Sequence, residues 1–285
     1  MKNVLVTGGS GQLASLIRRK SKDCKELKFL FVDLDELDIT SHESVSRFFE
    51  KYSLNYCINC AAYTAVDAAE ENESLARRVN AEGAGILALN CSKHLAKMVQ
   101  VSTDFVFNGT KGTPYKETDI ANPLSIYGQT KLEGEELVRK NLSEHFILRT
   151  SWLYSLEGNN FLKTMLRLGK ERDTLNVVND QIGTPTYAGD LADIILNIIQ
   201  TDSEKYGLYH YSNEGQTSWY GFASRIFELS GMSINLSPIP SKGYPTPATR
   251  PSYSVLDKAK IKKAFGIKIA EWEESLKDVL MQITS

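Results

Sequence analysis

A tyrosine and a lysine stand four residues apart in the stretch YGQTKLEGEEL, at Tyr127 and Lys131. The stretch has helical spacing, so both side chains should project from one face of a helix. A lysine ammonium beside a phenol favours the phenolate, which eases proton transfer at neutral pH. Because the chain holds 13 tyrosines, such a pair also arises by chance. Its chemical meaning therefore depends on the rest of the sequence.

Three oxygen-bearing side chains end an apolar run upstream of this pair. The stretch VSTDFVFNGT interrupts a strand-like pattern at Ser102, Thr103 and Asp104. Strands of a parallel sheet are buried on both faces, and polar groups at their carboxyl ends usually face the crevice where ligands bind. We therefore expect these oxygens to meet a substrate. Thr103 would polarise a carbonyl, Asp104 would contact the substrate, and Tyr127 would protonate the carbonyl oxygen.

A glycine-rich turn, VTGGSGQLA, follows the first apolar run and predicts a site for a hydride donor. Gly8 permits a tight turn, Gly11 lets backbone amides approach a pyrophosphate, and the small Ala14 lets a helix pack closely on the strand. The amino terminus of that helix adds partial positive charge for the phosphates. Together with Tyr127 and Lys131, this turn predicts hydride transfer from a nicotinamide to a carbonyl carbon.

The choice between NADH and NADPH stays open at this point. Asp33 ends the second apolar run, where a carboxylate can bind the ribose hydroxyls of NAD. Arg18 and Arg19 follow the glycine-rich turn and could instead attract the 2′-phosphate of NADP. Solvated surface charge is the alternative interpretation of all three side chains.

The elements that would position these residues alternate along the first half of the chain. Strand-like runs occur in KNVLVTG, KFLFVDL, YCINCAA, MVQVSTD and FILRTSW, separated by helical patterns such as HESVSRFFEKY and ESLARRVNAEGAGILALNCSKH. This order predicts an α/β fold with a doubly wound parallel sheet of the Rossmann type. We assign residues 1–152 to a dinucleotide-binding domain, completed by parts of 186–212. Residues 153–285 would mainly form a smaller C-terminal substrate-binding lobe.

Composition argues against several other classes of protein. The 285 residues carry 33 basic and 35 acidic side chains, without the basic excess that a nucleic-acid or membrane partner requires. There is no long apolar run and no signal-peptide pattern, so we expect a cytoplasmic protein that acts on a small molecule. The four cysteines are few for this length. Cys57 and Cys60 should point to opposite faces of a strand, as buried structural residues rather than metal ligands.

Longer stretches of the sequence resemble the extended short-chain dehydrogenase/reductase family. The motifs TGGSGQLA, NCAAYTAVDAAE, STD and YGQTK occur in that family's order. More closely, the chain is similar to the dTDP-4-dehydrorhamnose reductase family, through STDFVFNG, RTSWLY, GNNFLKTMLRLGKER, NDQIGTPT and YPTPATRPSYSVLD. The resemblance extends almost from end to end. It implies NADPH- or NADH-dependent reduction of the C4 carbonyl of dTDP-4-dehydro-L-rhamnose to dTDP-L-rhamnose, for the synthesis of rhamnose-containing polysaccharides.

The resemblance also implies roles for individual residues. Thr103, Tyr127 and Lys131 would form the catalytic set. Trp152 would pack against the deoxysugar, and Arg250 would pair with the nucleotide diphosphate. Taken with the turn and strand-end arguments, the predicted cofactor-binding residues are Gly8, Gly11, Gln12, Leu13, Asp33, Asp38, Ile39, Ala61, Ala62, Tyr63, Thr64 and Lys131. The predicted substrate-binding residues are Val66, Thr103, Asp104, Tyr127, Trp152 and Arg250.

Two groups of acidic residues are interpreted as helix surface. Asp67, Glu70, Glu71 and Glu73 form the first group, and we expect a solvated helix face there. Some members of the resembled family bind magnesium through glutamates at a dimer interface. Glu271, Glu273 and Glu274 form the second group and could play that part, but a helix surface explains them as well. We therefore predict no metal site, and leave magnesium and a homodimer open.

Two other functions are compatible with part of this pattern. An epimerase or dehydratase of the same superfamily would retain tightly bound NAD and return the hydride. A dehydratase would also need an acid pair beside the catalytic threonine, whereas STDF offers only Asp104. A non-catalytic dinucleotide-binding regulatory subunit need not keep Thr103, Tyr127 and Lys131 together, and this chain keeps them. The reductase is therefore the function that we predict.

Overall fold

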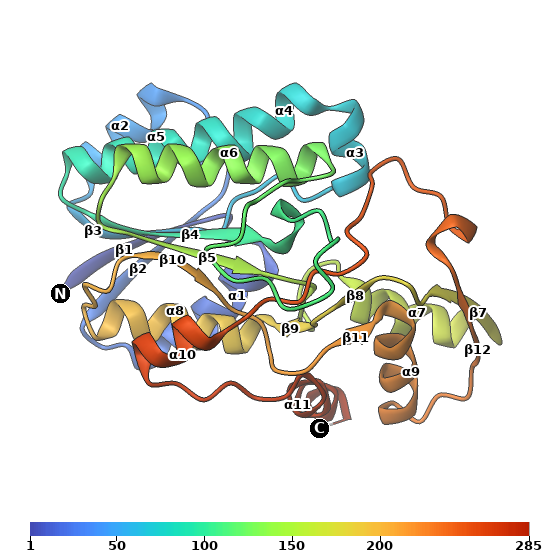
Figure 1. Cartoon of the computed structure of the whole chain (residues 1–285). Helices are drawn as coiled ribbons and strands as arrows, with labels where there is room; N and C mark the ends of the chain where they lie inside the picture. Colours follow the sequence, from blue (N-terminus) through green and yellow to red (C-terminus); the bar gives the residue numbers. More distant parts are fainter. Residues whose placement is uncertain (285) are drawn as a thin grey trace.

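A parallel six-stranded sheet forms the centre of the computed structural model, which describes residues 1–284 and confirms the predicted α/β fold (Figure 1). The strands lie in the order β10-β5-β4-β3-β1-β2 and every neighbouring pair is parallel. Their bounds are Lys2–Thr7 (β1), Leu27–Val32 (β2), Leu54–Asn59 (β3), Lys97–Thr103 (β4), His145–Thr150 (β5) and Gly207–His210 (β10). The chain steps from β1 outward to β2 and returns on the other side as β3. A crevice for a ligand is therefore expected beyond the carboxyl ends of β1 and β3.

Helices cover both faces of this sheet, which makes three layers (Figure 1). One face carries α2 (His42–Lys51), α5 (Ala84–Lys93) and α6 (Ile126–Asn141), and the other carries α1 (Gln12–Lys20), α8 (Ala188–Gln200) and α10 (Ala259–Phe265). Successive residues of β1 point to opposite faces of the sheet and so pack in two different cores. Leu5 packs with Phe49 of α2, while Val6 belongs to the core that α1 and α8 share. Within residues 1–284 no helix combines the length and apolarity needed to cross a bilayer.

The long helical pattern between residues 73 and 94 is divided in the structure. It runs through α4 (Glu73–Arg77) and a π-helical turn (η2, Arg78–Gly83) into α5. The wide turn brings the carbonyl oxygen of Asn80 against α6, where a Cβ atom on Gly134 would lie only 2.2 Å from it. Widened helical turns of this kind often occur at functional sites.

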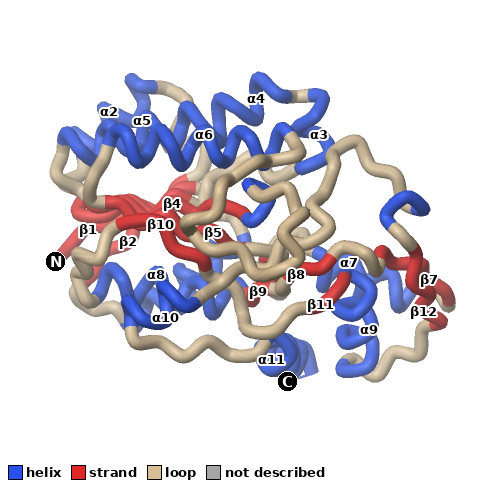
Figure 2. Tube along the Cα trace, viewed as in Figure 1, coloured by secondary structure: helices blue, strands red, loops and turns tan. Residues whose placement is uncertain are grey.

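The remaining elements form a second lobe beside the carboxyl edge of the sheet, where Figure 2 shows only short strands. They are β6 (Leu153–Tyr154), α7 (Phe161–Glu171), β7 (Thr174–Val178), β8 (Ile182–Gly183), β9 (Thr186–Tyr187), β11 (Thr217–Ser218), α9 (Trp219–Leu229), β12 (Asn235–Ile239), η4 (Ser241–Gly243) and α11 (Trp272–Thr284). Their core contains Leu162, Phe222 and Leu276, all fully buried. Two short 3₁₀ turns, η1 (Ser21–Asp23) and η3 (Asp104–Val106), and the short helix α3 (Val66–Glu71) complete the chain.

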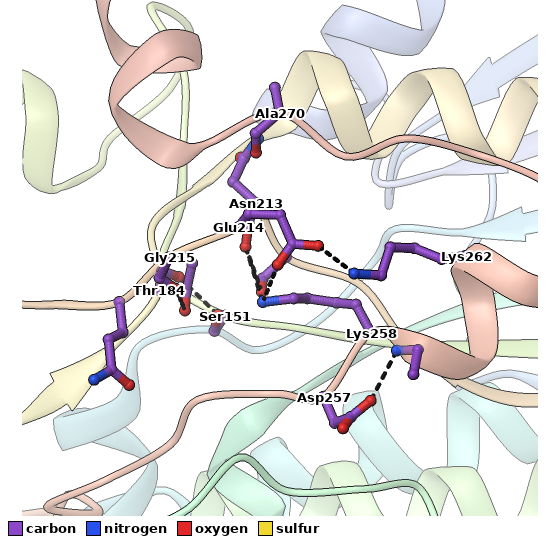
Figure 3. A network of polar contacts seen from close by, with 12 residues as sticks. Ser151, Thr184, Asn213, Glu214, Gly215, Asp257, Lys258, Lys262 and Ala270 are labelled. Atoms are coloured by element: carbon purple, nitrogen blue, oxygen red, sulfur yellow. Dashed lines mark hydrogen bonds and ion pairs between the residues drawn. The ribbon is translucent and has the colours of Figure 1, made fainter.

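A polar network around the buried Lys258 joins the C-terminal region to the segment that follows β10 (Figure 3). The ammonium of Lys258 donates to the carbonyl of Asn213 at 3.2 Å and lies 3.3 Å from Oε2 of Glu214. Lys262 contacts the other carboxylate oxygen of Glu214 at 2.7 Å. Burial lowers the pKa of Lys258 despite that carboxylate. A buried lysine needs such partners, because an unpaired charge in the interior is strongly unfavourable. The network therefore holds the loop before α10 against the segment that follows β10.

Candidate active site

The predicted catalytic residues lie on two adjoining elements. Thr103 ends β4, and Tyr127 and Lys131 lie in the first turns of α6. The Nζ atom of Lys131 donates to the carbonyl of Val101 at 2.6 Å, which ties the helix to the same strand. Ser125 caps α6 by accepting from the amide of Gly128 at 3.2 Å. The structure thus brings Thr103, Tyr127 and Lys131 together at one edge of the sheet.

Close packing fixes the orientation of Tyr127. Its ring meets the edge of Phe105 with centroids 5.5 Å apart at 76°. A Cβ atom on Gly128 would lie 2.2 Å from the carbonyl oxygen of Phe105, so a glycine is required for α6 to begin this close to η3. Phe105 therefore holds Tyr127 both through its ring and through its backbone.

The charges around Tyr127 differ from the sequence prediction. Burial raises the pKa of Tyr127 to about 12, the charge of Asp104 adds to that rise, and the Thr103 hydroxyl opposes it. Burial also lowers the pKa of Lys131 to about 8, against the effect of Glu135. Burial and the charge of Asp104 thus favour the protonated phenol, which is opposite to the effect expected of the Lys131 ammonium. That effect of Lys131 stays a prediction. At neutral pH Tyr127 is a protonated phenol, which suits a proton donor.

Asp104 is a buried carboxylate with one oxygen that is not hydrogen-bonded. Only 2% of the residue is exposed, and Thr103 Oγ1 donates to its Oδ1 atom at 3.1 Å. Its Oδ2 atom has no hydrogen-bond partner among residues 1–284. Burial raises the pKa of Asp104 to about 6, although nearby hydroxyls favour its charged form. Buried polar atoms without a partner are rare in folded proteins, which makes this carboxylate an unusual feature of the site.

The glycine-rich turn has the shape that a pyrophosphate needs. Gly8 has a φ of +63°, and a Cβ atom there would lie 2.9 Å from the amide nitrogen of Ala61. Gly11 is the N-cap of α1, so no side chain caps this end of the helix. The first turn of the helix also holds no acidic residue. The amides of Gly9, Ser10 and Gly11 donate within the protein, so the amides in the first turn of α1 are the ones that fit a dinucleotide phosphate.

Gln12 and Leu13, the next predicted residues, have different surroundings. Leu13 is buried in the core between the sheet and the helices α1 and α8. Only its backbone could therefore contact a ligand. The Gln12 carboxamide donates to the carbonyl of Leu153 at 3.2 Å and accepts from Ser155 at 3.3 Å and Asn160 at 3.2 Å. Gln12 therefore joins the glycine-rich turn to the second lobe.

The residues predicted for the adenosine half lie at the end of β2 and just after it. Asp33 accepts from the amide of Ser10 at 3.2 Å and also from its hydroxyl, so its carboxylate faces the glycine-rich turn. Asp38 accepts from the amide of Thr40 at 2.9 Å. Ile39 is buried in the core between the sheet and the helices α2, α5 and α6, so its side chain lies away from solvent.

The two arginines after the turn lie in different places. The Arg18 guanidinium lies 4.2 Å from the centroid of the Phe31 ring and donates to the carbonyl of Gly9 at 3.2 Å. Arg19 instead donates to the hydroxyl of Tyr187 at 3.3 Å, beside the second lobe. Only Arg18 therefore contacts the glycine-rich turn, where a 2′-phosphate could be expected.

The loop from Ala61 to Thr64 follows β3 and is held by Asn80, which the sequence analysis did not select. The Asn80 Oδ1 atom accepts from the amide of Tyr63 at 2.8 Å, while its Nδ2 atom donates to the carbonyl of Tyr63 and to Thr130 Oγ1, both at 3.1 Å. Asn80 therefore links this predicted cofactor loop to α6. A buried asparagine inside a helical pattern was the signal available for it.

Trp152 lies between the sheet and the second lobe in a strained backbone conformation, with a φ of +45°. Its indole stacks on Trp219 with centroids 3.6 Å apart and 11° between the planes. A Cβ atom on Gly183 would lie 2.6 Å from the same indole. Trp152 is thus partly packed by protein, and Trp219 is an aromatic neighbour that the sequence analysis missed.

Arg250 is engaged by the acidic group at the start of α3. Two hydrogen bonds join it to Asp67, and Asp67 also accepts from the amide of Ala248 at 3.2 Å. Val66, predicted to reach toward the sugar, is the first residue of this helix. The interpretation of Asp67 as part of a solvated helix face is therefore wrong.

Glu70 and Glu73 in that acidic group also have partners. Glu70 Oε1 accepts from the amide of Ile126 at 2.9 Å, at the start of α6. Glu73 pairs with Arg77 at 2.7 Å. Negative charge at a helix amino terminus is stabilising, which explains the place of Glu70. Glu71 and Glu73 are exposed, as expected for a solvated helix face, whereas Asp67 and Glu70 are only partly exposed.

Comparisons with known proteins agree over the whole chain. Residues 1–285 match the family model described as RmlD substrate binding domain. The chain is 43% identical to the dTDP-4-dehydrorhamnose reductase of Aggregatibacter actinomycetemcomitans, with 98% of each chain covered. It is 39% identical to the spore coat polysaccharide biosynthesis protein SpsK of Bacillus subtilis, with 100% of this chain and 99% of that protein covered. A crystal structure of dTDP-4-dehydrorhamnose reductase from Bacillus anthracis in complex with NADP has a TM-score of 0.96 at 39% identity, covering 99% of this chain and 100% of that one.

Proposed function

Because this chain belongs to the RmlD substrate binding domain family, we propose that it reduces the C4 carbonyl of dTDP-4-dehydro-L-rhamnose to dTDP-L-rhamnose with NADPH or NADH. The product would serve the synthesis of rhamnose-containing polysaccharide, in keeping with the similarity to the spore coat polysaccharide biosynthesis protein of Bacillus subtilis. The observation that carries the proposal is the half-buried Tyr127 next to Thr103, at the sheet edge where the glycine-rich turn lies, with a raised pKa that keeps its phenol protonated.

The residues of the chain divide the proposed reaction between them. Thr103 would exchange its hydrogen bond to Asp104 for one to the C4 carbonyl oxygen and so polarise that oxygen. Tyr127 would give its phenolic proton to that oxygen as negative charge develops, which is general acid catalysis. Lys131, charged at neutral pH, would bind the nicotinamide ribose and stabilise the phenolate left on Tyr127. A bound reduced nicotinamide would supply the hydride to the carbonyl carbon.

The remaining predicted residues would bind the two ligands. The turn from Gly8 to Gly11 and the amides at the start of α1 fit the pyrophosphate of the cofactor. Asp33 would face the adenosine ribose, and the loop from Ala61 to Thr64 would line the other side of the cofactor. Asp104 and Trp152 would contact the deoxysugar. Arg250 would exchange part of its contact with Asp67 for the nucleotide diphosphate.

We also propose the cytoplasm as the location of this reaction. All four cysteines lie in the described part of the chain, and none of them forms a disulfide. Cys57 packs in the core on the α2, α5 and α6 face of the sheet, and Cys60 packs against the core on the opposite face. Free thiols are typical of proteins in a reducing compartment.

A coupled assay tests the proposed reaction directly. The purified protein would be mixed with NADPH or NADH and with dTDP-4-dehydro-L-rhamnose, and the absorbance of the reduced nicotinamide followed. We expect a substrate-dependent loss of absorbance together with the appearance of dTDP-L-rhamnose. Dinucleotide that stays bound without being consumed would instead support the epimerase or the regulatory subunit.

A further inference from the structure

A fully buried carboxylate lies on α6 one helical turn beyond Lys131. Glu135 has 0% exposure, and its two oxygens accept from Arg149 at 2.8 Å from Nε and 2.7 Å from Nη2. Its Oε1 atom also accepts from Ser102 Oγ at 2.5 Å. Charged hydrogen bonds of this paired form are among the strongest in proteins. The carboxylate therefore connects α6 to two strands of the sheet.

The partners of Glu135 form a row across the sheet. Ser102 of β4 lies directly opposite Arg149 of β5, and Arg149 lies directly opposite His210 of β10. Burial lowers the pKa of His210 to about 3, so its imidazole is neutral at physiological pH. Its Nε2 atom lies 3.5 Å from Nη1 of Arg149. The row thus fixes Arg149 in place and leaves Glu135 as its anionic partner.

Ser102 and Glu135 each lie near a residue of the proposed catalytic set. Ser102 directly precedes Thr103, so a hydrogen bond to Ser102 fixes the strand end from which Thr103 projects. Glu135 stands four residues after Lys131, so the two side chains lie on the same face of α6. Neither residue of the ion pair is exposed to solvent that could screen its charge.

We propose that Glu135 is a positioning residue for the reduction: it orients Thr103 through Ser102 and supplies the negative charge that keeps Lys131 an ammonium. This proposal rests on the proposed function of Thr103, Tyr127 and Lys131. Glu135 itself touches neither the substrate nor the cofactor, because it is enclosed by the sheet and the helix.

The other groups around Lys131 cannot replace this charge. Burial raises the pKa of Cys60, at the end of β3, to about 12, so its thiol is neutral at physiological pH. Asp104 acts on Tyr127, which precedes Lys131 on α6, and Arg149 on β5 is paired with Glu135 itself. Among residues 1–284, Glu135 is the carboxylate that raises the pKa of Lys131 against the effect of burial. Removing the Glu135 carboxylate should therefore lower the pKa of Lys131, because burial would then act unopposed by that charge.

The charge can be tested by titrating Lys131 directly. Protein with ¹³C-labelled lysine would be followed by NMR over a range of pH, with the Lys131 signal assigned from Lys131→Met. We expect Glu135→Gln to lower the pKa of Lys131 by about one unit, as loss of a nearby opposite charge does. Glu136→Gln is the matched control, because it removes the same charge from the neighbouring exposed position of α6. An unchanged Lys131 titration in Glu135→Gln would overturn this part of the proposal.

A second variant keeps this test valid if Glu135→Gln fails to fold. Glu135→Gln combined with Arg149→Gln removes both buried charges together, and circular dichroism would establish that it folds. The Lys131 titration should move in the same direction in this double variant, and an unmoved titration would count against the proposal. The titration needs no turnover. If wild-type protein reduced no nucleotide sugar, the proposed function would fail while the effect of Glu135 on Lys131 could still be decided.

The link to Thr103 is tested through Ser102. We expect Ser102→Ala to lower kcat for the reduction about tenfold, with the affinity for NADPH and the Lys131 titration unchanged. Ser102→Thr keeps the hydroxyl and should restore most of kcat. Full activity in Ser102→Ala would overturn the positioning of Thr103 by Glu135.

Discussion

The guanidinium of Arg250 binds the carboxylate of Asp67 through two hydrogen bonds, Nη1 to Oδ1 at 3.0 Å and Nη2 to Oδ2 at 2.7 Å. The pair joins α3, which follows the proposed cofactor loop, to a loop of the C-terminal region. The same guanidinium donates to the carbonyl of Ala248 at 3.0 Å. A planar group that makes several bonds at fixed angles cannot be replaced by a lysine without loss.

Arg250→Lys should therefore weaken nucleotide-sugar binding. We expect KM for the sugar to rise several-fold with kcat nearly unchanged, because Thr103 and Tyr127 are not altered. Steady-state kinetics at saturating NADPH would measure both constants. Arg172→Lys, an exposed position after α7, serves as the control and should behave like the wild type. A loss confined to kcat would contradict the binding role of Arg250.

Tyr127→Phe should keep the fold and the affinity for dinucleotide while losing most turnover. The phenolic proton is the group transferred in the proposed reaction, and general acid catalysis typically contributes about 10²- to 10⁴-fold. Phenylalanine keeps the edge contact with Phe105, so the packing of α6 should survive. Dinucleotide binding by fluorescence and turnover by absorbance would separate the two effects. Undiminished turnover would remove Tyr127 as the proton donor.

Asp104→Asn should change how stability depends on pH. Burial raises the pKa of Asp104 to about 6, so the folded protein binds this proton more tightly than the unfolded chain. Stability from this group is therefore present at low pH and is lost as pH rises from about 4 to about 6. The asparagine variant has no carboxyl group at this position, so this fall in stability with rising pH should be absent from it.

The size of this effect follows from the shift in pKa. Relative to the wild type, Asp104→Asn should gain about 2–3 kcal/mol of unfolding free energy between about pH 4 and about pH 7. Urea unfolding at the two pH values would measure the gain. Any constant cost of burying the new amide cancels in the difference. An equal effect of the substitution at both pH values would contradict the raised pKa.

Asp33→Asn should shift the cofactor preference toward NADPH. The carboxylate of Asp33 faces the glycine-rich turn and would repel a 2′-phosphate, while it can accept from a ribose hydroxyl. Asparagine keeps a hydrogen-bond acceptor for Ser10 but removes the charge. The ratio of kcat/KM for NADPH to that for NADH should rise about tenfold. Asp35→Asn, an exposed neighbour, should leave the ratio unchanged.

The sheet and the main site elements could be predicted from the sequence because they depend on local patterns. Apolar runs of strand length identified β1 to β5, and the glycine-rich turn and the strand end at Thr103 followed from them. The last strand of the sheet was harder. β10 contributes only Gly207–His210, after a long insertion, so its sequence carries little strand pattern.

Contacts between distant segments could not be predicted in the same way. Asp67 and Arg250 are far apart in the chain, and their pairing depends on the loop that brings Arg250 back to α3. Glu135 was hidden among similar neighbours, since Glu133 and Glu136 lie beside it and only Glu135 is buried. A signal was present, because Lys131, Glu135 and Val138 share one face of α6 with spacings of four and three residues. A charged residue on that apolar face marks a buried ion pair.

The carboxamide of Gln12 belongs to the glycine-rich turn and yet makes its hydrogen bonds with Leu153, Ser155 and Asn160 of the second lobe. A dinucleotide on the turn and a sugar against the lobe would thus act on one shared side chain. If either ligand fixes that side chain, the affinities of the two are thermodynamically linked. Each ligand must then change the affinity of the other by the same factor. The synergy between cofactor and substrate would be set by a single amide.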